Sequence, residues 1–155
     1  TSEAAVRQLY DLPETALIEM GDFVGGLLKY LHKHPVARVT IAGGFAKMTK
    51  LAQGRLDLHS GRSSVDFAQL AQTAREVGAG QEIAALIANA NSALEALQIA
   101  QGAGIDLAAV IARAAWRTAA RALDTTESKL EIIMFDREGV QLARTPFREA
   151  IDGRN

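Results

Sequence analysis

The spacing of apolar and polar positions predicts several helices with short strands between them. Apolar side chains that recur every three or four residues predict helices with one buried face, whereas short runs of apolar and β-branched side chains predict strands. The predicted strands cover residues 16–20, 36–42, 130–135 and 140–144. The predicted helices cover residues 3–10, 23–33, 45–53, 64–77, 81–101 and 106–123.

The order of these elements indicates an α/β fold with a mostly parallel sheet. A strand, a glycine turn and a helix follow one another twice between residues 16 and 53, which is the rhythm of βαβ units. The helices at 81–101 and 106–123 are joined by a short turn, so we expect a long antiparallel helix pair. Residues 1–145 are predicted to form one domain and residues 146–155 a loosely held polar tail.

Composition narrows the class of protein. The 155 residues carry a net charge of −1, which gives no broad attraction to nucleic acid or to an anionic membrane. The absence of cysteine excludes disulfides, thiolate zinc sites and a cysteine nucleophile. There is no apolar run of about 20 residues and no signal-like start, so we expect a cytoplasmic protein without a membrane segment.

The first candidate site follows the strand predicted at 16–20. Gly21, Asp22 and Gly25 stand between that strand and a helix, where backbone amides favour anions and glycines let a ligand approach closely. Asp22 could accept a hydrogen bond from a ribose hydroxyl. The alternative is a tight turn in which Asp22 caps the helix.

The second candidate repeats this arrangement after the next strand. Gly43 and Gly44 precede a helix on which Lys47 and Lys50 are three residues apart and share a face. Such a turn with two lysines suits carboxylates or phosphates. The alternative is an ordinary turn with two solvated lysines, and neither candidate has the spacing of a dinucleotide or phosphate-loop fingerprint.

A polar loop supplies the third candidate. Asp57 and His59 would point to the same side of an extended segment, and a carboxylate beside an imidazole suits acid–base work. Ser60 and Arg62 follow in the same loop. The alternative is a surface loop with an Asx-type turn.

Basic residues elsewhere have simpler explanations. Arg113, Arg117 and Arg121 form a stripe on the last helix, which a polyanion could use but which is more often a solvated face. His32 and His34 flank a helix end where a cation is favourable. No metal site is predicted there, because no third ligand is near in sequence.

The run from residue 21 to residue 66 closely resembles the C-terminal half of the CbiD family, the cobalt-precorrin-5B carbon-1 methyltransferases of cobalamin biosynthesis. The matching pieces are Gly21–Gly25, Gly43–Lys47, Lys50–Ala52 and His59–Ser60, which occur in order. The resemblance implies that the chain is the C-terminal, Rossmann-like part of a longer enzyme, folded as a three-layer sandwich. The N-terminal part of the same protein is then an implied partner, and a homo-oligomer is left open.

The resemblance also implies the chemistry. S-adenosylmethionine would give its methyl group to a ring carbon of a cobalt tetrapyrrole, with cobalt present only in that substrate. The glycine turns with Asp22 would cradle the methyl donor or the edge of the acceptor. Lys47, Lys50, Ser60 and Arg62, helped by Arg55, would bind the substrate carboxylates, and His59 with Asp57 would move a proton. The alternative function is a non-catalytic nucleotide-binding or interaction module.

Overall fold

A small mixed sheet forms the centre of the fold, and its middle strand pairs with each of the others. The computed structural model describes residues 1–59 and 64–151. The strands are β1 (Arg38–Gly43), β2 (Lys129–Phe135), β3 (Gln141–Arg144) and β4 (Arg148–Glu149). The helices are α1 (Ser2–Tyr10), the short 3-10 helix η1 (Glu14–Ala16), α2 (Val24–Lys33), α3 (Phe45–Ala52), α4 (Phe67–Glu76), α5 (Gln81–Ala88), α6 (Ala93–Gly102) and α7 (Leu107–Leu123).

The strand directions correct the prediction of a mostly parallel sheet. β1 and β2 are parallel, in a register that runs from Arg38 opposite Lys129 to Gly43 opposite Met134. β3 and β4 both pair antiparallel with β2. The reason is local, because a short turn after β2 returns the chain along the strand that it has just left. One parallel pair and two antiparallel pairs result.

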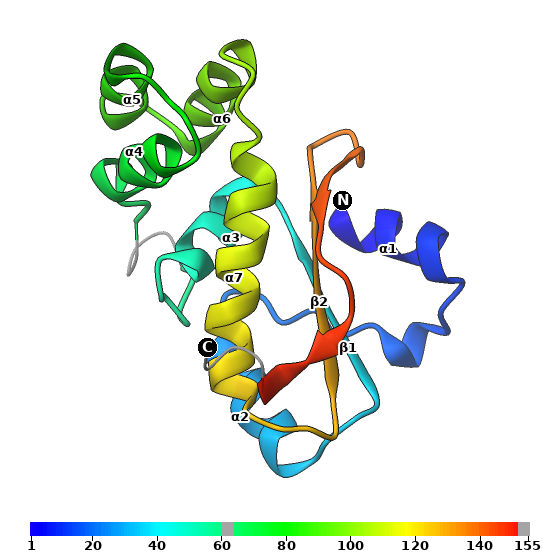
Figure 1. The fold of residues 1–155 in the computed structure, drawn as a ribbon. Coiled ribbons are helices and arrows are strands. Elements are labelled where there is room, and N and C mark those ends of the chain that lie inside the picture. The colour runs from blue at the N-terminus through cyan, green and yellow to red at the C-terminus, as the bar shows by residue number, and fades with distance from the viewer. Residues whose placement is uncertain (60–63, 152–155) are drawn as a thin grey trace.

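Helices cover both faces of this sheet, which confirms the α/β class (Figure 1). Alternate residues of β2 point to opposite faces. Ile132 and Met134 belong to the larger buried cluster, which includes residues of α2, α3 and α7, whereas Ile133 and Phe135 form a smaller cluster with Val6 of α1. Because both faces are covered, every residue of β2 after Lys129 is buried.

Helix α7 is the longest helix described and packs through small side chains. Ala112, Ala115 and Ala119 are fully buried on its inner face. Side chains of this size let two helices approach closely, and α7 makes its most extensive helix contacts with α3. Trp116 of α7 is also buried, and its indole N–H donates to the Leu130 carbonyl at 2.7 Å.

The predicted long helix pair is wrong, because residues 81–101 form two helices. The break lies before Ser92, whose side chain accepts a hydrogen bond from the Glu95 amide at 3.1 Å. The Glu95 carboxylate accepts in turn from the Asn91 amide at 2.7 Å. This exchange resembles a capping box, which starts a new helix at Ala93. α4, α5 and α6 therefore form a small group of helices at one end of α7 (Figure 1).

The strand predicted at 16–20 is also wrong. Residues 14–16 form η1, and residues 17–20 pair with no strand in the described chain. Leu17 and Met20 still pack against buried residues, whereas Ile18 is exposed. An apolar run becomes a strand only where a sheet edge is there to pair with it.

Residues 148–150 lie within the range predicted as a polar tail. Residues 148–149 form β4, and Ala150 is fully buried. The Arg148 guanidinium lies 4.1 Å from the centre of the Trp116 ring. Residues 148–150 are therefore packed against the rest of the described chain. None of the helices described is long and apolar enough to cross a membrane.

Candidate functional site

The predicted site residues that the structure describes gather at one edge of the sheet. β1 ends at Gly43, opposite Met134 near the end of β2, so both parallel strands finish at this edge. The turn at residues 20–23, the glycines after β1 and the loop at residues 56–59 meet there. With Lys47 and Lys50 of α3, we call these residues the strand-end cluster. Open α/β sheets bind ligands outside the carboxyl ends of their strands.

Lys47 joins the two glycine turns. Its ammonium group lies 3.3 Å from a carboxylate oxygen of Asp22 and 3.4 Å from the Gly21 carbonyl oxygen. Asp22 is therefore an ion-pair partner, and the alternative that it caps α2 is wrong, since the N-cap is Phe23 without a side-chain hydrogen bond. Both charged groups remain partly exposed, so the pair contributes little to stability and is open to exchange with a ligand.

The loop at 56–59 is fixed to the same turn. The Leu58 amide donates to the Asp22 carbonyl at 2.8 Å, and the Leu58 side chain is buried. The Lys50 ammonium donates to the Leu58 carbonyl at 3.1 Å. Two lysines from one face of α3 thus hold the turn and the loop together, which the spacing of three residues makes possible.

Gly25 is needed for the close approach of this loop to α2. A Cβ atom at residue 25 would lie only 2.8 Å from the Cβ of Leu56. The Gly25 amide donates to the Leu56 carbonyl at 3.1 Å, so this helix N-terminal amide is already bonded. Gly21 has a different role, because its φ of +56° is strained for other residues.

Asp57 and His59 lie close together at the end of the described part of this loop. The His59 backbone amide donates to an Asp57 carboxylate oxygen at 3.1 Å, which forms an Asx turn. The His59 residue is exposed and Asp57 is half-buried. Ser60 and Arg62, also predicted to bind substrate, lie outside the described residues.

Arg137 belongs to this edge, and sequence reasoning missed it. The turn from Asp136 to Gly139 follows β2, and a Cβ atom at Gly44 would lie 3.9 Å from the Phe135 carbonyl oxygen, just before it. Arg137 is exposed in this turn. Arg137 could have been found from the parallel pairing of β1 with β2, because this pairing places the segments that follow the two strands side by side.

A buried charge on the α1 face of the sheet also escapes the sequence analysis. Glu131 of β2 is fully buried and accepts hydrogen bonds from the Tyr10 hydroxyl, from Thr40 Oγ1 at 2.8 Å and from Arg144 Nε at 2.9 Å. Arg144 also donates to the Tyr10 hydroxyl. We call these four residues the Glu131 network. Its sequence signal is a single carboxylate within an otherwise apolar strand.

The network changes the acidity of its members. Burial, and then the hydrogen bond to the Glu131 carboxylate, raises the pKa of the Tyr10 phenol above its usual value. The hydrogen bond to the same carboxylate also raises the pKa of the Arg144 guanidinium. Tyr10 therefore stays neutral and Arg144 charged, which is the combination that stabilises a buried carboxylate.

The fold and this edge define a small α/β domain whose lysines and glycine turns gather at the carboxyl ends of its parallel strands. The chain belongs to the CbiD family: the family model described as "CbiD, C-terminal domain" matches residues 57–146, more than half of the chain. No solved structure matches it.

Named relatives extend the match to nearly the whole chain. The chain is 58% identical over 143 residues to the cobalt-precorrin-5B C(1)-methyltransferase of Methylorubrum extorquens, covering 92% of this chain and 40% of the relative. It is 57% identical over 145 residues to the protein of that name from Agrobacterium fabrum, covering 94% and 39%. The protein of that name from Halorhodospira halophila is 51% identical over 144 residues, covering 93% and 39%. The chain thus spans about 40% of the length of these relatives.

Proposed function

We propose that this chain is the C-terminal domain of a cobalt-precorrin-5B C(1)-methyltransferase of the anaerobic route to cobalamin. The family match and the identity to relatives of that name support this function. Because the chain corresponds to about 40% of those relatives, the N-terminal part of the same protein is its proposed partner. The finer proposal is that the strand-end cluster faces the substrates of methyl transfer.

One observation carries the proposal for the site. Segments far apart in the sequence, the turn at 20–23, the two lysines of α3 and the loop at 56–59, meet at the carboxyl edge of the sheet. Turns that only connect a strand to a helix would need fewer charged side chains than these segments carry. The convergence of cations, glycine turns and a histidine is what a polar small-molecule ligand needs.

The lysines are proposed to bind the substrate through its peripheral carboxylates. Lys47 is held by one partly exposed ion pair and the Gly21 carbonyl oxygen, and Lys50 by the Leu58 carbonyl oxygen. A substrate carboxylate can compete for both ammonium groups, because the Lys47 pair is partly exposed and Lys50 meets only a neutral carbonyl oxygen. Arg55 and Arg137 are exposed in neighbouring loops and would extend this cationic edge. Ser60 and Arg62 keep the same proposed role.

The chemistry of the cluster also fits S-adenosylmethionine, which supplies a methyl group on a positively charged sulfur. A Cβ atom at Gly21 would meet nothing within 4 Å, and one at Gly44 would meet only the Phe135 carbonyl oxygen. The backbone at both glycines is therefore open to a ligand. Asp22 can accept from hydroxyl groups and Lys47 can donate to a carboxylate. The chain's contribution is to hold donor and acceptor in line, since orientation alone can supply several kcal/mol.

His59 is the proposed proton carrier, positioned by Asp57. The Asx turn orients the two residues relative to each other, because the carboxylate accepts from the His59 amide. An exposed imidazole at this edge can take up a proton and pass it to solvent. The rival function, a non-catalytic binding module, would leave His59 without a role in the reaction.

Calorimetric titration of this chain with S-adenosylhomocysteine and with the cobalt tetrapyrrole tests the proposal. We expect the variant K47Q/K50Q to bind the tetrapyrrole at least tenfold more weakly than the unmodified chain. R75Q/R113Q removes the same charge from exposed helix positions outside the cluster and should change binding less than twofold. Equal binding by K47Q/K50Q would refute the carboxylate role. Binding of neither ligand would place the substrates on the N-terminal part of the enzyme.

A further inference from the structure

Positive charge is concentrated on two helices that pack together. The chain as a whole has a net charge of −1. α2 carries Lys29 and Lys33, and α7 carries Arg113, Arg117 and Arg121, whereas neither helix contains an acidic residue. α2 packs against α7. Where the ends of the two helices meet, Lys29, Lys33 and Arg121 therefore form a cationic surface, which attracts anions from solution.

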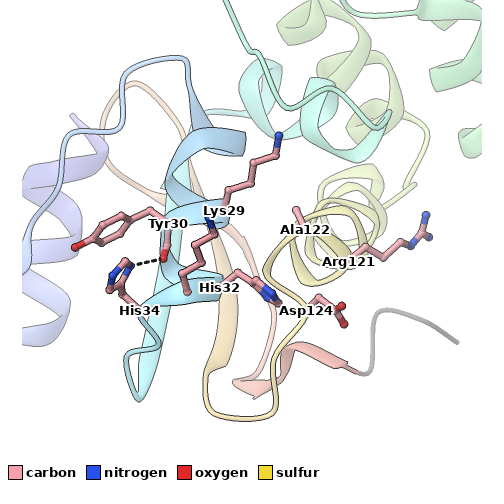
Figure 2. Close-up of a pocket in the computed structure, with 8 residues that line it drawn as sticks. Lys29, Tyr30, His32, His34, Arg121, Ala122 and Asp124 are labelled. Carbon is pink, nitrogen blue, oxygen red and sulfur yellow. Dashed lines mark hydrogen bonds between the residues drawn. The ribbon is translucent and has the colours of Figure 1, made fainter.

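This surface contains a cavity. Between the last turns of α2 and α7 lies an opening of about 590 Å³, lined by Lys29, Tyr30, His32, Lys33, Arg121 and Asp124, among others. Figure 2 shows the two helix ends side by side, with His32 between them. We call this cavity the basic groove. Its volume is in the range of small-molecule sites, about 300–1,000 Å³.

The cations in the groove are not needed to complete the helix ends. Basic side chains often lie near helix C-termini because they bond the last carbonyl groups. Here other groups do so. The His32 imidazole donates from Nδ1 to the Leu123 carbonyl at 2.9 Å, and the His34 imidazole donates from Nδ1 to the Tyr30 carbonyl at 3.1 Å.

Neither lysine of the groove has a direct ion-pair partner among the described residues. Within residues 1–59 and 64–151, neither Lys29 nor Lys33 makes an ion pair or a hydrogen bond. Both residues are exposed. Asp124 brings one negative charge to the groove, against Lys29, Lys33 and Arg121. The groove therefore keeps an excess of positive charge even with both imidazoles neutral.

The groove is separate from the strand-end cluster. The cluster contacts the first turn of α2, at Gly25, whereas the groove is formed by the last turn of that helix. A helix of ten residues is about 15 Å long. The two regions lie at opposite ends of α2, so a ligand in the groove would not occupy the cluster.

We propose that the basic groove binds a small polyanion through its carboxylate or phosphate groups. Lys29 and Lys33 act as compact point charges, and Arg121 adds a third positive charge to the lining of the groove. Three cations along the groove select a ligand with at least two such groups. This site is independent of the proposed methyl transfer.

Nuclear magnetic resonance titration of the isotopically labelled chain tests the proposal. The probes are tripolyphosphate, citrate and uroporphyrin, so that phosphate, small carboxylate and tetrapyrrole carboxylate sources are compared. We expect at least one of them to shift the backbone amides of residues 29–34 and 120–124. Binding should weaken at least tenfold in K29Q/K33Q and less than twofold in R7Q/R75Q, which removes two exposed charges from α1 and α4. Far-ultraviolet circular dichroism verifies that both variants fold.

Two results would overturn the proposal. The first is that none of the three probes shifts the amides of the groove. The second is that R7Q/R75Q weakens binding as much as K29Q/K33Q, which would show general attraction to exposed basic side chains. Shifts confined to residues 20–25 and 43–59 would show binding at the strand-end cluster alone, and would therefore contradict binding in the groove. The result for the groove can thus be told apart from the result for the proposed function.

Discussion

Glu131 has the most demanding environment of any single residue in the described chain. Its carboxylate is fully buried, and its partners come from α1, β1 and β3. Removing one partner from a buried ion pair is costly because the other charge remains without compensation, whereas replacing both by apolar residues is often tolerated. The Glu131 network should therefore respond very differently to single and double substitution.

Urea denaturation of R144M and E131L/R144M measures this difference. We expect R144M to lower the free energy of unfolding by about 3 kcal/mol, since Glu131 keeps only neutral donors. The double variant should recover at least half of that loss. If the double variant is no more stable than R144M, the charge of Glu131 is not what makes the single variant unstable.

Tyr10 should make the stability of the chain sensitive to alkaline pH. Burial and Glu131 raise the pKa of its phenol in the folded state, so the folded protein holds this proton more tightly than the unfolded one. The stabilisation is complete below the unfolded pKa of about 10 and is lost as pH rises through the folded pKa. Denaturation of Y10F and of the unmodified chain from pH 8 to pH 12 should show the two stabilities converging above pH 10. A constant difference would contradict the raised pKa.

At the scale of single residues, the sequence predicts the composition of the site better than its contacts. Lys47, Lys50, Gly21 and Asp22 are predicted as site residues from their places after apolar runs, and the structure brings them together. The ion pair of Asp22 is not predictable in this way, because it joins residues 25 positions apart. Glu131 is easily overlooked because its strand is otherwise apolar.

Among the elements, α2 shows how two adjacent glycines differ in their surroundings. A Cβ atom at residue 25 would lie 2.8 Å from the Leu56 Cβ, whereas one at residue 26 would meet nothing within 4 Å. Both glycines lie inside the helix. Glycine in a helix interior lowers the free energy of unfolding by about 1 kcal/mol relative to alanine. The surroundings of each glycine therefore decide whether its replacement by alanine stabilises or destabilises the chain.

Thermal and urea denaturation of G25A and G26A tests this contrast. We expect G25A to destabilise the chain by about 1–3 kcal/mol, since the loop at 56–58 must move away from α2. G26A should stabilise it by up to about 1 kcal/mol. G25A is also expected to shift the amide resonances of residues 56–58. A stabilising G25A would contradict the close packing of the loop.

Element boundaries are predicted well where the signal is local. α2, α3, α7, β2 and β3 lie within two residues of their predicted positions, because helix periodicity, glycine and proline are local features. The break between α5 and α6 has such a signal in Ser92 and Glu95, but the continuous apolar stripe across it conceals the break. The strand predicted at 16–20 fails for a non-local reason, the absence of a pairing edge.

For the whole molecule, the position of β2 determines which parts are most stable. It pairs with β1 along one edge and with β3 and β4 along the other, and both of its faces are covered. α5 packs chiefly on α4 and α6, away from the sheet. Local opening is cheapest where few buried contacts must be broken. This order of strands is not predictable from local sequence patterns, since it depends on pairings between distant segments.

Native-state hydrogen exchange measures the resulting gradient. We expect the amides of Leu130–Met134 to exchange at least a hundredfold more slowly than those of Ala84–Ala88 in α5, because opening β2 requires most of the molecule to unfold. Amides of α7 should be close to those of β2. Equal protection of α5 and β2 would show instead that the chain unfolds as one unit.

The four positions of the Glu131 network, 10, 40, 131 and 144, are distant in sequence and adjacent in space. Natural substitutions at these positions should therefore be correlated. A relative that replaces the acid at 131 with an aliphatic residue is expected to lose the arginine at 144 as well, because an unpaired guanidinium would have no counter-ion there. Such paired replacements leave a record of this tertiary contact in the evolutionary history of the family.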